Sequence, residues 1–127
     1  MPDLLSGFHH ASLIVADTEA SLDFYQGVLG LRLDPSRPDL GYPGAWLNVG
    51  GEQIHLLELA NPDPLRGQLV HGGRDRHLAF RVADLDVLIR ALERAEIDYS
   101  LSRSGRRALF CRDPDQNALE FIEQSTT

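Results

Sequence analysis

The sequence contains no lysine, a single cysteine and no long apolar run, and each absence excludes a class of protein. Cys111 is the only cysteine among 127 residues, so an internal disulfide is impossible and a reducing compartment suits the chain. No apolar segment approaches the roughly 20 residues that a membrane-spanning helix needs. The N-terminal residues lack a basic segment followed by an apolar one, which argues against a secretory signal. We therefore expect a cytoplasmic protein that does not enter a membrane.

Positive charge is also scarce. All twelve basic residues are arginine, and the net charge is −7. Binding along a phosphate backbone needs clustered positive charge, so this balance argues against nucleic acid as a partner. Any anion site must use guanidinium groups, which bind carboxylates and phosphates through paired hydrogen bonds. Hydrophobic residues make up 43% and charged residues 24%, which is typical of a globular domain with a substantial core.

A repeated segment organises the chain. Residues 10–17 and 77–84 both follow the pattern H-x-x-x-x-V-A-D, and the two histidines are 67 positions apart, as are the two aspartates. Each copy has the pattern of a strand, and apolar residues at helical spacing follow it. Asp17 and Asp84 stand where a helix N-cap belongs, and Gly30 is placed to end the first helix in a left-handed conformation.

Each half then continues with a strand–turn–strand pattern. In the first half, apolar runs at 45–49 and 54–59 flank a Gly-Gly-Glu-Gln turn. Their counterparts in the second half are residues 108–111 and 119–123, around a turn about two residues longer. Residues 60–75, rich in proline and glycine near both ends, are predicted to link the halves.

We therefore predict an α+β fold of two βαβββ modules that form curved, barrel-like mixed sheets. Module one spans about residues 7–59, and module two spans about 76–124. Halves of this size bury too little surface to be stable alone, so residues 1–127 are predicted to form a single domain.

Polar side chains stand in strands that are otherwise apolar. His10 and His77 lie on equivalent strands, opposite the apolar face, and His55 and Glu120 occupy equivalent places in the last strand of each half. Such groups cost free energy in an apolar strand unless they are paired or bound to metal. The four side chains predict one divalent metal site, and nitrogen and oxygen ligands suit zinc, nickel, iron(II), manganese or cobalt.

Other roles stay open for individual histidines. A single strand histidine is more often a hydrogen-bonded structural residue than a ligand, and the neighbours of His55 would also suit a pocket-lining role. His9 points away from His10, and His71 lies in the predicted linker, so both are predicted to be surface residues.

The chain resembles the vicinal oxygen chelate superfamily, which includes glyoxalases, ring-cleaving dioxygenases, and fosfomycin and bleomycin resistance proteins. The resemblance covers nearly the whole chain and rests on F-H-H-A-S-L-I-V-A-D-T-E-A-S-L-D-F-Y-Q-G-V-L-G-L, residues 8–31, and D-P-D-Q-N-A-L-E-F, residues 113–121. It implies a glyoxalase-like fold, a homodimer, and metal ligands that fall on His10, His77 and Glu120. The remaining ligand position is variable in the family and falls on His55.

The resemblance leaves three functions open. Glyoxalase I enzymes resemble this chain but usually have a glutamate where His55 stands. A metal-dependent lyase, isomerase or thiol transferase would chelate two neighbouring substrate oxygens, and Glu120 or a metal-bound water would handle the proton. Ring-cleaving dioxygenases resemble it in using two histidines and one glutamate around iron(II). The third function is that of a metal-free binding protein, as in bleomycin-sequestering relatives, which generally lack these ligands.

Substrate recognition is less evident from the sequence. Arg103 and Arg107 belong to an arginine-rich segment beside the strand at 108–111, and a loop there would bind a carboxylate or phosphate. The alternative is a solvated surface loop. Trp46 and Phe110 are predicted to line a pocket for a small-molecule substrate, although strand aromatics are more often part of the core.

Overall fold

The computed structural model describes residues 3–63 and 71–124, and the chain divides into two compact units, Met1–Asn61 and Pro62–Thr127. The first unit contains β1 (His10–Val15), α1 (Thr18–Leu22), η1 (Asp23–Val28), β2 (Arg32–Leu33), β3 (Gly44–Val49) and β4 (Glu52–Glu58). The second contains η2 (Gly72–Arg74), β5 (His77–Val82), α2 (Leu85–Arg94), β6 (Tyr99–Leu101), β7 (Ala108–Arg112) and β8 (Ala118–Glu123).

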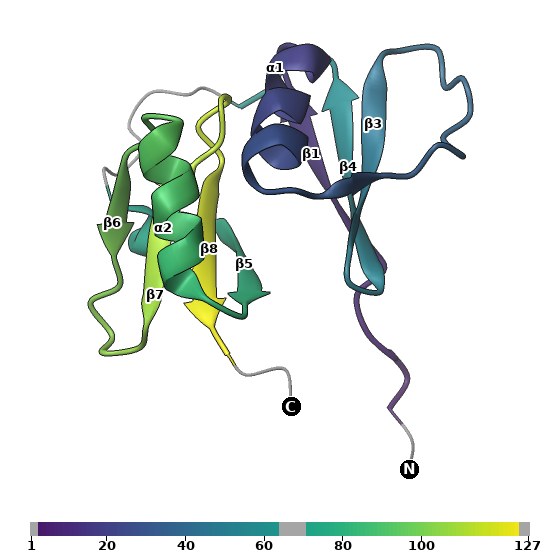
Figure 1. Cartoon of the computed structure of the whole chain (residues 1–127). Coiled ribbons are helices and arrows are strands. Elements are labelled where there is room, and N and C mark those ends of the chain that lie inside the picture. The colour runs from purple at the N-terminus through teal and green to yellow at the C-terminus, as the bar shows by residue number, and fades with distance from the viewer. Residues whose placement is uncertain (1–2, 64–70, 125–127) are drawn as a thin grey trace. The chain divides into compact units, whose positions relative to one another are not determined.

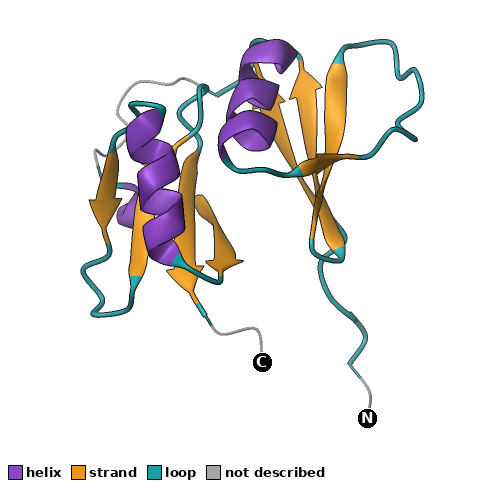
Figure 2. Ribbon diagram, viewed as in Figure 1, coloured by secondary structure: helices purple, strands orange, loops and turns teal. Residues whose placement is uncertain are grey.

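The two units have the same topology. The strand orders are β1-β4-β3-β2 and β5-β8-β7-β6, and in each sheet the first and last strands of the unit pair in parallel while the other pairs are antiparallel. Within each unit the helix lies across one face of the sheet (Figures 1 and 2). The predicted βαβββ modules are therefore confirmed. No helix in the described ranges is long and apolar enough to cross a membrane.

The core of each unit lies between its helix and the sheet. In β5 the even-numbered residues are half-buried and the odd-numbered residues are exposed, as the period of two in a strand requires. The predicted division of this strand into an apolar face and a histidine face is thus confirmed. The largest fully buried hydrophobic side chains come from both units: Tyr25, Leu47, Leu56, Leu85, Leu92, Leu109 and Leu119.

The helix of the first unit differs from the regular helix that the apolar spacing predicts. After α1 the backbone widens into the π-helical segment η1, which buries both Phe24 and Tyr25. A π-turn advances neighbouring side chains through a smaller angle than an α-turn, so two successive aromatic rings reach the core. Gly30 follows with a φ of 75°, which confirms its predicted left-handed conformation.

The predicted linker, residues 60–75, can be compared with the structure only in part, since residues 64–70 lie outside the described residues. At its end, Gly72–Arg74 forms the short 3₁₀ turn η2 rather than an irregular connection. Gly72 is buried, and a Cβ there would lie 3.3 Å from Cδ1 of Phe110. The missing side chain therefore lets the turn approach β7 closely.

Two acidic side chains at equivalent positions accept hydrogen bonds at the start of each helix. Asp17 accepts hydrogen bonds from the amides of residues 19 and 20, and Asp84 accepts from those of 86 and 87, as predicted for N-caps. A glutamate from the last strand adds a second acceptor: Glu58 Oε1 lies 2.8 Å from the Thr18 amide, and Glu123 Oε2 lies 2.9 Å from the Leu85 amide. The last strand of each unit is thereby tied to the start of its helix.

The Glu123→Gln variant is expected to be less stable than the parent protein at neutral pH, and the difference should shrink in acid. The Leu85 amide, and then the Arg107 side chain, hold the pKa of Glu123 below its usual 4.5. A lowered pKa in the folded state stabilises the fold above the unfolded-state pKa, and this contribution disappears as the pH falls through the folded-state value. Urea unfolding of the parent protein and the variant, at pH 7 and at pH values below 4.5, measures this difference in stability. The exposed Glu96→Gln is the control, and a pH-independent loss would contradict the linkage.

Candidate metal and substrate site

The four predicted ligands lie on equivalent positions of the two sheets. His10 and His77 are the first residues of β1 and β5. In the parallel pairs, His55 lies opposite Ser12 and Glu120 lies opposite Ala79, and these partners hold the same place in their strands. The register therefore confirms that His55 and Glu120 are equivalent, and each unit brings two of the four side chains together.

In the first unit, His10 and His55 stack face to face. Their ring centroids are 4.0 Å apart, and the Trp46 ring stacks on the other side of His55 at 4.5 Å. Because β3 and β4 pair with Trp46 opposite His55, the indole lies against this imidazole and limits its orientation. His9 is exposed, as predicted, but the prediction that it points away from His10 is wrong, because its Nδ1 lies 2.8 Å from Nδ1 of His10.

A hydrogen-bonded chain fixes the tautomer of His55. Gln53 Nε2 donates to Oδ2 of Asp34 at 2.7 Å, so Oε1 of Gln53 faces His55 Nε2 at 2.8 Å and accepts a hydrogen bond from its N–H. Backbone and side-chain hydrogen bonds from Ser36 lower the pKa of Asp34, which keeps this carboxylate ionised. Burial and the neighbouring His10 lower the pKa of His55, so its ring is neutral and the free lone pair is on Nδ1.

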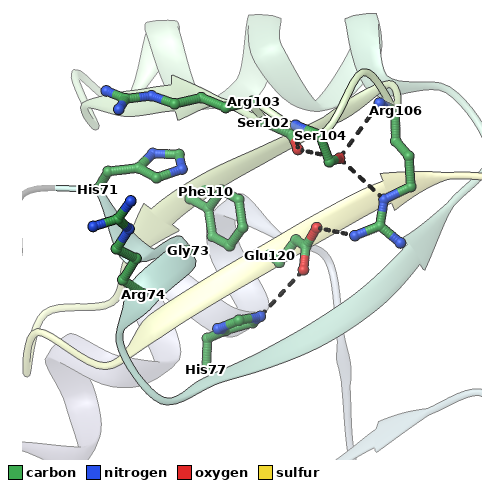
Figure 3. Close-up of a pocket in the computed structure, with 10 residues that line it drawn as sticks. All are labelled: His71, Gly73, Arg74, His77, Ser102, Arg103, Ser104, Arg106, Phe110 and Glu120. Carbon is green, nitrogen blue, oxygen red and sulfur yellow. Dashed lines mark hydrogen bonds and ion pairs between the residues drawn. The ribbon is translucent and has the colours of Figure 1, made fainter.

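In the second unit, His77 faces Glu120, a carboxylate that is only 4% exposed. Nε2 of His77 lies 3.2 Å from Oε1 of Glu120, while Nη2 of Arg106 lies 3.3 Å from Oε2 (Figure 3). One carboxylate oxygen is thus directed towards the histidine, and the other is held by the guanidinium.

The other nitrogen of His77 shows where a proton of the ring lies. Nδ1 lies 2.9 Å from the carbonyl oxygen of Asp75, which only accepts hydrogen bonds, so Nδ1 must carry a proton. In the neutral ring, Nε2 then has a lone pair that faces the carboxylate oxygen of Glu120. Two electron-rich atoms in such an arrangement need a proton or a cation beside them. A backbone carbonyl behind a metal-binding histidine is also the usual outer partner of such a ligand.

The donor chemistry of both pairs therefore fits a divalent metal. Neither unit, over its described residues, assembles three or more His, Cys, Asp or Glu side chains in a metal-binding arrangement, and each contains one of the two pairs, His10 with His55 and His77 with Glu120. Imidazole nitrogen with one carboxylate suits transition metals. Burial raises the pKa of the Cys111 thiol to about 12, so this residue stays protonated and is neither a ligand nor a nucleophile at neutral pH.

A pocket of about 570 Å³ opens beside His77 and Glu120. Phe110, which lies opposite Glu120 on β7, forms its apolar wall. The remaining lining residues come from the turn around η2 and from the β6–β7 loop (Figure 3): His71, Gly73, Arg74, Ser102, Arg103, Ser104 and Arg106.

The two predicted substrate-binding arginines are placed differently. Arg103 lines the pocket. Arg107 is not among the lining residues, and its guanidinium is ion-paired with Glu123 at 2.9 Å and Asp86 at 3.1 Å. The period of two explains the difference, because Arg107 precedes β7 in phase with the buried Leu109, whereas Arg106 is in phase with Phe110.

His71 and Arg74 are among the pocket residues that were not sequence-predicted site residues. His71 is half-buried instead of being a surface residue, with Nδ1 2.6 Å from Oγ of Ser100 and its ring packed edge-on against Phe110. Arg74 follows it in η2. The double glycine at 72–73 is the available signal, since it allows this turn to lie against a strand.

Comparisons with known proteins found a matching family model and several similar proteins. The model of the Glyoxalase/Bleomycin resistance protein/Dioxygenase superfamily matches residues 7–121. The chain is 34% identical to Glyoxylase I 4 of Arabidopsis thaliana, over 92% of this chain and 70% of that protein. It is 30% identical to a lactoylglutathione lyase of Haemophilus influenzae, over 93% of each chain. A glyoxalase family protein of Bacillus anthracis has the same fold, with a TM-score of 0.80 and 23% identity over 98% of this chain and 100% of that one.

Proposed function

Because the chain belongs to the Glyoxalase/Bleomycin resistance protein/Dioxygenase superfamily, we propose that it is a metal-dependent enzyme acting on a small molecule. The proposed reaction class is that of a lyase, isomerase or thiol transferase, on a substrate with two neighbouring oxygen atoms. The names of two relatives, Glyoxylase I 4 and lactoylglutathione lyase, support the lyase class. We further propose that it acts in the cytoplasm as a homodimer.

The proposed ligands are His10, His55, His77 and Glu120, so each unit contributes one pair. The main support is the contact between Nε2 of His77 and Oε1 of Glu120 at 3.2 Å, with Nδ1–H of His77 directed to the Asp75 carbonyl oxygen. The matching register of His55 and Glu120 supports the same assignment for the first unit.

The side chains of the second unit have separate proposed roles in the reaction. When bound, the metal would polarise the substrate oxygens and stabilise negative charge that develops on them. Glu120 is the proposed base, which takes a proton from the substrate at a carboxylate oxygen and returns it later. Arg106 holds the other oxygen and thereby orients the carboxylate. Phe110 shields one side of this pocket from water.

Metal analysis tests the proposal. Protein purified without chelator or metal-affinity resin is expected to contain stoichiometric divalent metal, as measured by elemental analysis. Oxygen-sensitive protein loaded with iron would instead favour the ring-cleaving dioxygenase. Protein that takes up none of zinc, nickel, iron(II), manganese or cobalt, even when each is supplied, would contradict metal dependence and favour a metal-free binding protein.

A further inference from the structure

We propose that the pocket of the second unit binds its substrate through an oxyanion, a carboxylate, phosphate or phosphonate group, held by Arg74 and Arg103. This inference rests on the proposed function, since it names the substrate class for the same site. Its basis is the set of side chains around the pocket, which differ in charge from the chain as a whole.

The first argument is the local charge. Three arginines line the pocket, against a single carboxylate, Glu120, which is already paired with Arg106 and His77. Arg74 and Arg103 form no ion pair or hydrogen bond with any residue of 3–63 or 71–124. In a chain with a net charge of −7, two such guanidiniums at one cavity are an excess of positive charge.

The second argument is the order of the loop that presents Arg103. Oγ of Ser102 and Oγ of Ser104 are 2.8 Å apart, and the Ser104 amide donates back to Ser102 Oγ at 3.2 Å. Ser104 Oγ also accepts a hydrogen bond from Nε of Arg106 at 3.3 Å. Gly105 provides the left-handed turn with a φ of 87°. The loop is thus held by its own hydrogen bonds, so little conformational entropy is lost when an anion binds.

The third argument is the placement of Arg74, which lies on η2 and not on the loop that presents Arg103. The turn η2 packs against Phe110, where a Cβ on Gly73 would lie 2.9 Å from Nε2 of His71. Glycine at 73 leaves room for the His71 ring, and the buried Gly72 lets the turn lie close to β7. Arg74 and Arg103 consequently lie beside the aromatic wall on the side of the pocket away from Arg106, as Figure 3 shows. A small molecule there would contact Phe110 while its anionic group reaches the two guanidiniums.

The size of the pocket limits the substrate. A volume of about 570 Å³ lies within the range of small-molecule sites and accommodates a compact molecule rather than a polymer. Guanidinium groups bind both planar carboxylates and tetrahedral phosphates through paired hydrogen bonds. The pocket thus suits a small substrate with an oxyanion group, and the experiment below distinguishes a planar from a tetrahedral group.

The test compares two double variants that remove equal charge from the same unit. In R74Q/R103Q both pocket guanidiniums are lost, and in R90Q/R94Q two arginines of α2 outside the pocket are lost. Binding of inorganic phosphate, methylphosphonate and acetate is measured by calorimetry at low ionic strength, with metal-loaded and chelated protein. Circular dichroism checks that each variant is folded.

Saturable binding of at least one probe is expected, and R74Q/R103Q should weaken it by about tenfold or more, because charge-assisted hydrogen bonds are lost. The α2 variant should change it by no more than about twofold. Preference for acetate would identify a carboxylate, and preference for phosphate or methylphosphonate a tetrahedral group. Absence of saturable binding, or equal weakening in both variants, would overturn the anion site.

The result is separable from that of the proposed function. If chelated protein still binds the anion through Arg74 and Arg103, the anion site stands even should the chain hold no metal. If the chain holds stoichiometric metal but binds no anion, the anion site falls and the metal-dependent enzyme stands.

Discussion

Replacing His77 with alanine is expected to abolish stoichiometric metal binding, and Glu120→Gln should do the same. Loss of an outer hydrogen-bond partner of a ligand already costs about 10–100-fold in metal affinity, so loss of a ligand should cost at least about 100-fold. In the first variant Glu120 loses its contact with His77 and keeps the one with Arg106. In the second variant a neutral amide replaces the charged carboxylate ligand. Elemental analysis after dialysis against buffered metal measures the effect.

The matched control is His71→Asn. His71 lines the same pocket and is not a proposed ligand, so this variant should keep its metal. Because Glu120 is 4% exposed, circular dichroism must confirm that Glu120→Gln is folded. Full metal content in folded His77→Ala would refute the ligand assignment, while loss in all three variants would point to damage to the pocket in general.

Replacing Leu109 with alanine is expected to destabilise the protein by about 2–5 kcal/mol, because the change leaves a cavity in a packed core. Leu109 is 0% exposed and lies opposite Phe121, which is 3% exposed. The total stability of a domain is only about 5–15 kcal/mol, so the loss should be evident in urea unfolding. Leu101→Ala, at a position 61% exposed in the same unit, is the control and should change stability by no more than about 0.5 kcal/mol.

The same variant tests whether residues 1–127 form a single cooperative domain, as we propose. Trp46 is the only tryptophan, and it belongs to the first unit, whereas Leu109 belongs to the second. In a single domain, Leu109→Ala shifts the unfolding midpoint of Trp46 fluorescence as far as that of the far-ultraviolet circular dichroism. A fluorescence midpoint that stays in place would mean that the two units unfold separately.

The repeated pattern was sufficient to predict the βαβββ modules, since strand alternation, N-cap aspartates and Gly30 each have a local physical cause. It was also sufficient to predict that His55 and Glu120 hold equivalent positions, because equivalent strands have equivalent registers. The π-helical segment η1 was not predictable from apolar spacing, because the burial of both Phe24 and Tyr25 is decided by packing in the core.

The site was only partly predictable for a different reason. Arg106 and Arg107 are adjacent and precede β7, so the strand alternation that separates their side chains applies to them only if the backbone is already extended before Ala108. Arg74 and His71 could not be predicted as pocket residues, since a segment rich in glycine and proline has no periodicity that assigns its side chains to a face. Their role depends on the close packing of η2 on Phe110, which only the three-dimensional structure reveals.

The unlike side chains at the equivalent positions of β4 and β8 also determine the charge balance of the proposed ligand set. Histidine binds metal as a neutral ring, so this set offers only one negative charge, from Glu120. A dication held by two glutamates would be neutralised by the protein itself. With a histidine at position 55, one unit of positive charge is left over, and a singly deprotonated substrate would restore electroneutrality on binding.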